Sequence, residues 1–150
     1  MQKAEARHLP QGRQISEILY ASDLSPESMV AAPYAISLAQ EYQAHLTLLH
    51  VITPQRTGDL VAPHELLASS ERLLRNMVPA EAELWCQPEY LVEDGDPSTK
   101  ILETAQRKGV DLIVLGVRGT ANLGAATNLI GATAHKVVSQ AICPVLTVRG

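Results

Sequence analysis

Three glycines near the carboxyl end of the chain have the arrangement of an anion-binding loop. Gly116 and Gly119 follow an apolar run at residues 112–115, and Gly131 opens a later segment with helical periodicity. Glycine lets backbone N–H groups approach an anion closely, and the first turn of a helix adds unpaired N–H groups and about half a positive charge. A strand, a glycine-rich loop and a helix in this order predict phosphate binding without a lysine.

Two polar residues at the ends of other apolar runs are further candidates for chemistry. Asp23 follows the run at residues 18–21, and His50 lies near the end of the run at 46–51. Asp23 also precedes Ser25, so a turn or capping role explains it as well as a binding role does. Packing explains His50 as readily as catalysis, and both alternatives stay open.

The sequence lacks the motifs of common catalytic and metal sites. No G-x-S-x-G, H-E-x-x-H or G-x-x-x-x-G-K-[S/T] occurs. Cys86 and Cys143 form no C-x-x-C pair, and the histidines show no H-x-x-x-H spacing. We therefore expect no metal site, two structural thiols and a binding protein rather than an enzyme.

The composition is typical of one globular domain. The chain has 150 residues, of which 46% are hydrophobic and 19% charged, with a formal net charge of −4. This charge and the few aromatic residues argue against a nucleic-acid partner. No apolar run reaches the ~18 residues of a membrane helix, so we expect a cytoplasmic protein with no membrane partner. Residues 1–14 are polar and predict a flexible tail or linker before a domain at residues 15–150.

Apolar runs and helical periodicity alternate along the chain. Strands are predicted at residues 18–21, 46–51, 89–93, 112–115 and 145–148, with 83–86 as an alternative start of the third. Helices are predicted from residue 26, at 64–78, from residue 97 to about 108, and at 131–140. Ser25 and Asp96 suit N-caps, and Gly109 suits the left-handed position after a helix.

The first helix has a regular apolar pattern with one exception. Large residues recur every fourth position with alanines beside them, which predicts one buried face; its residues are Val30, Tyr34, Leu38 and Tyr42, with Ala31, Ala35 and Ala39. Pro33 cannot donate a backbone hydrogen bond to Met29, so the helix is expected to bend there.

This alternation predicts an α/β fold. Right-handed connections between such strands give an open, five-stranded parallel sheet with helices on both faces. In the strand order 3-2-1-4-5 the first and fourth strands are neighbours, and ligands of such sheets bind beyond the carboxyl ends of the strands. The loops that hold Asp23 and Gly116 would then face one crevice.

Short motifs follow one another in a characteristic order: I-L-Y-A-S-D at residues 18–23, L-L-H-V at 48–51, G-D-P at 95–97, G-V-D-L-I-V-L-G at 109–116 and C-P-V-L-T-V at 143–148. In these motifs the chain resembles the universal stress protein (UspA-like) family from about residue 15 to residue 149. The resemblance implies a Rossmann-like domain that is usually dimeric and takes part in stress responses.

One branch of that family binds ATP through G-x-x-G, nine residues and then G-[S/T]. Gly116 and Gly119 match the first part, but eleven residues precede Gly131. Ala132 replaces the hydroxyl residue, with Thr133 one position later. The lost donor is worth about 0.5–1.5 kcal/mol, or up to about 3 kcal/mol toward a charged acceptor. The resemblance thus implies weak binding of ATP or another adenine nucleotide, with or without Mg²⁺.

The resemblance also implies roles for residues outside the glycine pattern. Ala21 and Asp23 fall where the family contacts the adenosine portion, and Val51 falls where backbone groups meet adenine. Arg118, inside the glycine loop, is expected either to contact a phosphate or to lie in solvent.

The last predicted strand suggests a second function. It would be an edge strand with unpaired backbone groups, which favours pairing with a second copy; its residues are Val145, Leu146, Thr147 and Val148. The resemblance supports such a homodimer.

The sequence leaves two interpretations of function. The first is a homodimer that binds an adenine nucleotide weakly. The second is a dimeric interaction module without nucleotide, in which the longer loop fills the crevice with Ala125, Ala126 or Leu129.

Overall fold

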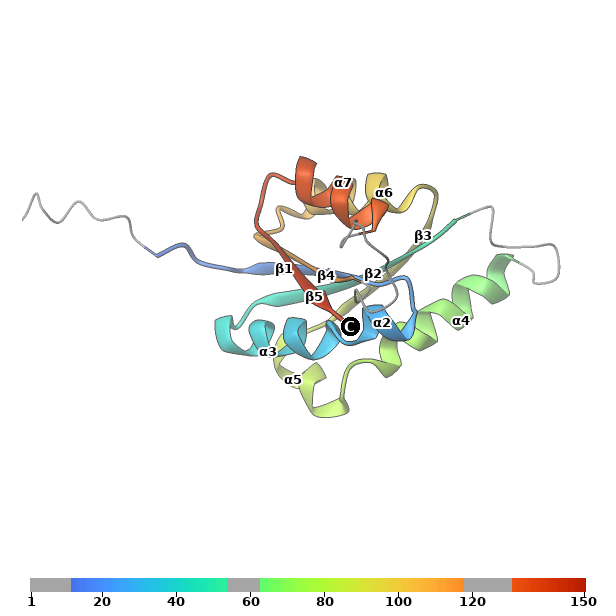
Figure 1. The fold of residues 1–150 in the computed structure, drawn as a ribbon. Coiled ribbons are helices and arrows are strands. Elements are labelled where there is room, and N and C mark those ends of the chain that lie inside the picture. Colours follow the sequence, from blue (N-terminus) through green and yellow to red (C-terminus); the bar gives the residue numbers. More distant parts are fainter. Residues whose placement is uncertain (1–11, 54–62, 118–130) are drawn as a thin grey trace, which may run out of the picture.

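The computed structural model describes residues 12–53, 63–117 and 131–150. Five strands form one parallel sheet in the order β3-β2-β1-β4-β5 (Figure 1), as predicted. Their bounds are β1 Glu17–Ala21, β2 His45–Ile52, β3 Glu89–Asp94, β4 Leu112–Val117 and β5 Val145–Arg149. β1 is the central strand, because Ala21 lies in register with Leu49 of β2 and Leu115 of β4.

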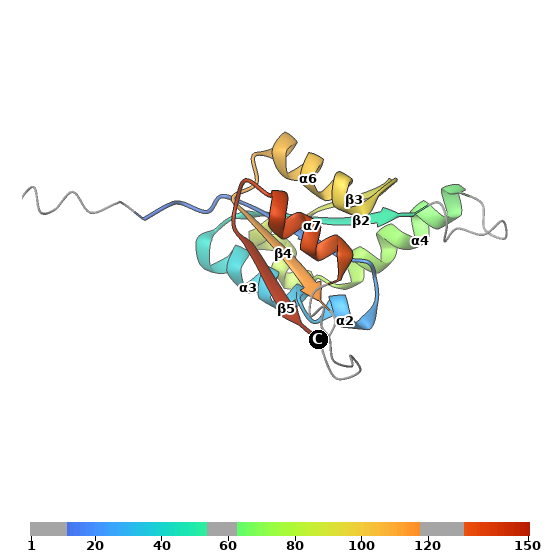
Figure 2. The same ribbon diagram turned by 45° about the horizontal axis from the view of Figure 1, so that its top comes forward.

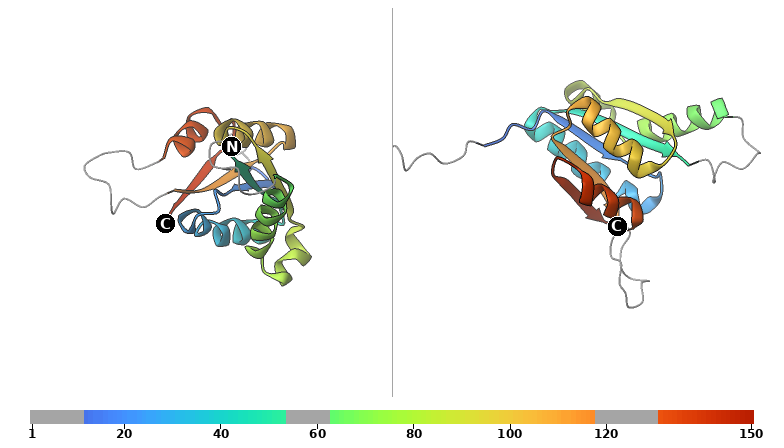
Figure 3. Two further views of the ribbon diagram at one scale, coloured as in Figure 1. Left: turned by 90° about the vertical axis from the view of Figure 1, so that its right-hand side faces the viewer. Right: turned by 90° about the horizontal axis from the view of Figure 1, so that it is seen from above.

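Helices cover both faces of the sheet. Figure 3 shows this layering end-on, with α6 and α7 on one face and α2 to α5 on the other. Their bounds are α2 Pro26–Met29, α3 Ala32–Tyr42, α4 Pro63–Asn76, α5 Glu83–Cys86, α6 Pro97–Lys108 and α7 Ala132–Gln140. The predicted α/β class is therefore confirmed.

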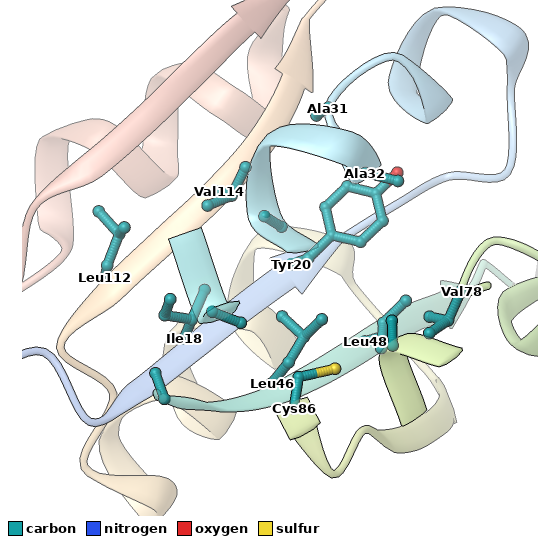
Figure 4. Packing of buried hydrophobic residues seen from close by; sticks show 14 of the residues in the cluster. Ile18, Tyr20, Ala31, Ala32, Leu46, Leu48, Val78, Cys86, Leu112 and Val114 are labelled. Atoms are coloured by element: carbon teal, nitrogen blue, oxygen red, sulfur yellow. The ribbon is translucent and has the colours of Figure 1, made fainter. Parts of the chain in front are cut away.

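Each face of the sheet has its own hydrophobic core, because side chains alternate along a strand. Ile18, Leu46 and Leu48 are fully buried on the face covered by α3, α4 and α5 (Figure 4). Leu19 and Leu49 are fully buried on the opposite face, beneath α6 and α7. Burial of each such side chain contributes about 1.5–3 kcal/mol, so both faces hold the strand ends in place.

The predicted bend at Pro33 is a complete break. α2 ends at Met29 and α3 begins at Ala32, so Pro33 occupies the second position of the new helix. A proline is tolerated there, because the first N–H groups of a helix have no partner within it.

The predicted buried face of this helix is confirmed for its alanines and wrong for its tyrosines. Ala31, Ala35 and Ala39 are fully buried, whereas Tyr34 and Tyr42 are 57% and 44% exposed. The alanine row lets the α3 backbone approach the sheet closely, and this geometry leaves the tyrosines at the margin of the contact.

Residues 83–86 form helix α5 and are not part of a strand. Ala82 and Cys86, four residues apart, are both buried, which is the spacing of a helix face. Gln87 then adopts a left-handed conformation (φ 46°) and ends the helix before β3. The preceding helix, α4, ends at Asn76, two residues before the predicted end.

The predicted caps are confirmed. Ser25 Oγ accepts a hydrogen bond from Ser28 N at 3.2 Å, and Gly109 adopts a left-handed conformation (φ 63°) after α6. Asp96 Oδ2 accepts hydrogen bonds from Thr99 Oγ1, Thr99 N and Ser98 Oγ at 2.8, 3.0 and 2.8 Å. These bonds lower the pKa of Asp96 to about 2, and the two bonds from Thr99 have the largest effect.

The Asp96 cap should make stability depend on pH. Its pKa in the folded chain lies below the ordinary value of 3.8, so its contribution is complete above about pH 4 and is lost as the pH falls toward 2. Asp96→Asn keeps one acceptor but does not titrate. We expect the variant to melt below the native chain at pH 7 and the difference in Tm to shrink between pH 4 and pH 2. A difference that stays constant over this range would contradict the assignment.

Candidate functional site

A cavity of about 590 Å³ lies at the carboxyl ends of β1, β2 and β4. This is the place where open parallel sheets bind ligands. It brings together five of the residues predicted to contact a nucleotide, namely Ala21, Asp23, Val51, Gly116 and Thr133. The remaining wall comes from β2, β4, the loops that follow β1 and β2, and helices α2, α4, α6 and α7. Its residues are Ser22, Leu24, Ser28, Leu49, His50, Ile52, Thr53, Leu66, Ser69, Ser70, Leu73, Pro97, Ile101, Leu115 and Ala134.

The turn between β1 and α2 is held by a dense set of hydrogen bonds. The Ser22 and Ser28 hydroxyls lie 2.8 Å apart, and Ser22 Oγ also accepts from Leu24 N at 2.9 Å. Tyr20 Oη donates to the Ser28 carbonyl oxygen at 2.7 Å, and burial raises the pKa of this phenol. Leu24 takes a left-handed conformation (φ 65°), which this network stabilises. The wall of the cavity at β1 is therefore rigid.

Asp23 lies in this turn, and its carboxylate takes part in the hydrogen bonding there. Its Oδ1 accepts a hydrogen bond from Ser25 N at 2.9 Å, so the predicted turn role is confirmed. Asp23 also lines the cavity. The two interpretations offered by the sequence are therefore compatible.

His50 lines the cavity from β2. Its Nδ1 lies 2.9 Å from the Ser22 carbonyl oxygen. A carbonyl oxygen only accepts, so Nδ1 carries the hydrogen and, in the neutral ring, Nε2 is an acceptor. The bond places the imidazole between β1 and β2 and fixes its orientation.

Gly116 has a structural role that the glycine pattern did not indicate. A Cβ atom at this position would lie 2.5 Å from Cα and 2.7 Å from the carbonyl oxygen of Ser28. Only glycine lets β4 and the α2 backbone approach this closely. The residue therefore shapes the cavity wall whether or not it contacts a ligand.

The start of α7 supplies the other side of the site. Gly131 is its N-cap and gives no side-chain hydrogen bond to the first turn, unlike Ser25 of α2 and Asp96 of α6. Thr133 of this first turn lines the cavity. Gly131 and Ala132 are exposed beside it. Arg118, Gly119 and the loop at 120–130 lie outside the described residues.

The sequence analysis overlooked the contribution of α4. Ser70 is only 3% exposed and shares the helix face of Leu66 and Leu74, so a serine stands in an otherwise apolar stripe. That break in the pattern was the available signal. Ser69, beside it, donates its hydroxyl to the Leu66 carbonyl oxygen at 3.1 Å.

Residues 12–53, 63–117 and 131–150 contain no group of three or more His, Cys, Asp or Glu side chains that could hold a metal ion. Nor do they contain a helix with the length and apolar character needed to cross a membrane.

The last strand lies at the edge of the sheet, beside α7 (Figure 2). No described element pairs with its outer side. Val145, Leu146, Thr147 and Val148 are half-buried. Apolar side chains flank this edge on both faces of the sheet: Val30 is 39% exposed, Val138 46% and Ile142 86%.

Comparison with known proteins identifies the family. Residues 15–149 match the universal stress protein family. Universal stress protein YxiE of Bacillus subtilis (strain 168) is 35% identical over 148 residues, which cover 89% of this chain and 99% of that protein. The chain belongs to the universal stress protein family.

Solved structures share the fold of this family member. The hypothetical protein MJ0577 matches with a TM-score of 0.76 at 23% identity, covering 92% of this chain and 98% of that one. A universal stress protein in complex with cAMP matches at 0.62 and 21% identity, covering 91% and 98%. The Archaeoglobus fulgidus protein in complex with dAMP matches at 0.59 and 18%, covering 91% and 99%. At these identities the likeness concerns the fold.

The close contact at Gly116 makes a testable prediction. Gly116→Ala should lower the free energy of unfolding by about 2–3 kcal/mol, because the new methyl group meets backbone atoms that cannot rotate away. Gly131→Ala is the matched control, since a Cβ there has no neighbour within 4 Å. Its cost should stay below about 1 kcal/mol, the penalty of alanine at an N-cap. Equal losses in urea unfolding would contradict the role of the contact.

Proposed function

We propose that this universal stress protein binds an adenine nucleotide, ATP included, in the cavity above β1, β2 and β4, and forms a homodimer through β5. It would act in the cytoplasm, in a stress response, as a binding protein rather than an enzyme. The observation that carries the proposal is the cavity of about 590 Å³ that gathers Ala21, Asp23, Val51, Gly116 and Thr133. Its volume lies within the ~300–1,000 Å³ usual for small-molecule sites.

The walls of the cavity suit the nucleoside part of such a ligand. Ala21, Leu49, Val51 and Ile101 offer apolar surface for a base. Asp23 offers carboxylate acceptors for the ribose hydroxyls, which are strong partners for an anionic oxygen. The complexes of related folds with cAMP and dAMP support the same ligand class.

The phosphates would depend on backbone groups and helix α7. Asp23 is the one acidic or basic residue, histidine aside, among the described residues that line the cavity. No described Lys or Arg lines it, so the uncapped first turn of α7, with Gly131, Ala132 and Thr133, is the proposed anion site. Arg118 and Gly119 remain proposed contacts. Mg²⁺ is proposed only as a companion of the nucleotide phosphates.

The hydrogen bonding of His50 supports a binding role over a catalytic one. Its Nδ1 bonds to the carbonyl oxygen of Ser22 and not to the Ser22 hydroxyl. That hydroxyl lies 2.8 Å from the Ser28 hydroxyl instead. The pair of nucleophile and base that hydrolysis would need is therefore not assembled at this turn.

The alternative function is a dimeric interaction module without nucleotide. The residues that would fill the crevice in that case, Ala125, Ala126 and Leu129, lie outside the described residues. A nucleotide titration separates the two functions directly, because only the first predicts a ligand-dependent rise in stability.

Nucleotide binding predicts a thermal shift that depends on Asp23. ATP or AMP at ten times its dissociation constant should stabilise the native chain by about 1.4 kcal/mol, which raises Tm by about 3–6 °C. Asp23→Asn should weaken binding about 10- to 100-fold, the loss expected for a hydrogen bond to a charged group. Asparagine retains an oxygen for the bond to Ser25 N, so the turn itself should survive. No shift of native Tm at 5 mM nucleotide would refute the binding proposal.

Dimerisation through β5 predicts that a proline at position 147 gives monomers. In the parallel ladder Ile113 N donates to Pro144 O and Gly150 N donates to Val117 O, so even-numbered residues of β5 bond to β4. The N–H of Thr147 therefore points outward, and Thr147→Pro removes it without breaking the sheet. Sedimentation should show native dimers and folded variant monomers. A monomeric native chain, or a dimeric variant, would contradict the proposal.

A further inference from the structure

Ser22 lies directly before Asp23, and the neighbouring strand holds its backbone on both sides of the peptide. Its N–H donates to the Leu49 carbonyl oxygen of β2 at 2.9 Å, and its carbonyl oxygen accepts from His50 Nδ1 at 2.9 Å. Ser22 is only 6% exposed, although it belongs to the wall of the cavity. The main chain is therefore fixed immediately before Asp23.

The Ser22 hydroxyl is fully used within the turn. The Ser28 hydroxyl donates to the Ser25 carbonyl oxygen at 3.1 Å, and a hydroxyl has one hydrogen to give. In the contact of 2.8 Å between the Ser22 and Ser28 hydroxyls, Ser22 is therefore the donor. Ser22 Oγ also accepts from Leu24 N at 2.9 Å. Because its one hydrogen is engaged, this hydroxyl does not donate to a ligand.

Ser28, the acceptor of that bond, is itself fixed from two sides. Its carbonyl oxygen accepts from Tyr20 Oη at 2.7 Å. Its backbone lies so close to Gly116 of β4 that a Cβ atom on the glycine would be 2.5 Å from Ser28 Cα. The Ser22 hydroxyl thus ties the turn to a group that cannot move away from the sheet.

The bond from Leu24 N supports a backbone conformation that leucine seldom adopts. Leu24 has a φ of 65°, in the left-handed region, which is unfavourable for a residue with a Cβ atom. This conformation sets the direction in which the chain leaves Asp23, whose Oδ1 accepts from Ser25 N at 2.9 Å. Without the Ser22 hydroxyl the turn would sample other conformations, and Asp23 would be held less firmly in the wall of the cavity.

We infer that Ser22 is a positioning residue for the nucleotide: its hydroxyl holds the turn in the conformation that presents the Asp23 carboxylate to the ribose. The inference rests on the proposed function and on the role proposed there for Asp23. Ser22 acts through preorganisation, because a turn that is ordered before the ligand arrives has less freedom to lose on binding. Loss of its hydroxyl should therefore weaken the contact to the ribose hydroxyls and spare the rest of the ligand.

The test compares AMP with its 2′,3′-dideoxy analogue, which lacks both ribose hydroxyls. In calorimetric titration, with displacement of AMP for the weaker ligand, the native chain should bind AMP at least about tenfold more tightly than the analogue. Ser22→Ala should weaken AMP binding about five- to twentyfold and change analogue binding by less than about twofold. A role confined to overall stability would weaken both nucleotides by the same factor, and that outcome would overturn the inference.

A double-mutant cycle tests whether Ser22 acts through Asp23. Asp23→Asn removes most of the proposed ribose contact and keeps an oxygen for the bond to Ser25 N. Adding Ser22→Ala to this variant should weaken AMP binding by less than about twofold, because the effects of residues that act together are not additive. An equal loss of affinity in the native and Asp23→Asn backgrounds would contradict the inference.

Ser25→Ala is the matched control. Ser25 caps the same helix, its hydroxyl accepting from Ser28 N at 3.2 Å, and it is not among the described residues that line the cavity. This variant should lower Tm through loss of the cap and keep AMP affinity within about threefold of the native value. If Ser25→Ala weakens AMP binding as much as Ser22→Ala does, general loosening of α2 explains both and the inference is refuted.

The remaining failures are distinguishable. If the native chain binds neither AMP nor ATP, the proposed function fails and this inference fails with it. If it binds AMP and the analogue equally well, nucleotide binding stands and the positioning role is refuted. If Ser22→Ala does not fold, Tyr20→Phe takes its place, since it keeps the ring and removes the bond that fixes Ser28. It should weaken AMP binding about two- to fivefold and leave analogue binding unchanged.

Discussion

Ser28, in helix α2, is the contact on which the site depends. Its backbone packs so closely against Gly116 of β4 that no side chain fits between them. Its carbonyl oxygen accepts the Tyr20 hydroxyl, and its own hydroxyl bonds to Ser22. One residue therefore joins the ends of β1 and β4 to α2. That contact fixes how closely α2 lies against the two strand ends, and hence the wall of the cavity on that side.

The described lining of the cavity has hydrogen-bond acceptors and apolar side chains but no cationic side chain, and this affects how a nucleotide would be held. Oxygen and imidazole acceptors come from Asp23 and His50, and apolar surface comes from β1, β2 and α6. Cationic side chains are missing from the described lining. Recognition of a base and a ribose would therefore rest on side chains, whereas phosphates would rest on backbone N–H groups at α7. Backbone donors tolerate the replacement of serine or threonine by Ala132, because every residue but proline carries an N–H.

Sequence patterns predicted the fold well where one local cause dominates. Continuous apolar runs gave all five strands, and the caps at Ser25, Asp96 and Gly109 are confirmed because capping depends on neighbouring atoms. The prediction failed where helices pack. Tyr34 and Tyr42 matched an apolar stripe, but the sheet contacts the alanine row instead. Residues 83–86 were an alternative start of the third strand, but they form helix α5. The helix buries Ala82 and Cys86, four residues apart, against a core that local sequence does not reveal.

The chain by itself determined its α/β class, strand order, family and the loops that meet at the crevice, because these follow from periodicity and short motifs. Only the tertiary structure decided what else enters the site. It assigned Gly116 a packing role and brought Ser70 of α4 into the cavity that His50 lines from β2, although the two belong to different elements. Such placements depend on how helices lie against the sheet, and contacts between distant segments leave little trace in local sequence. The serine in the apolar stripe of α4 acquires meaning only because the tertiary structure places it in the wall of the cavity.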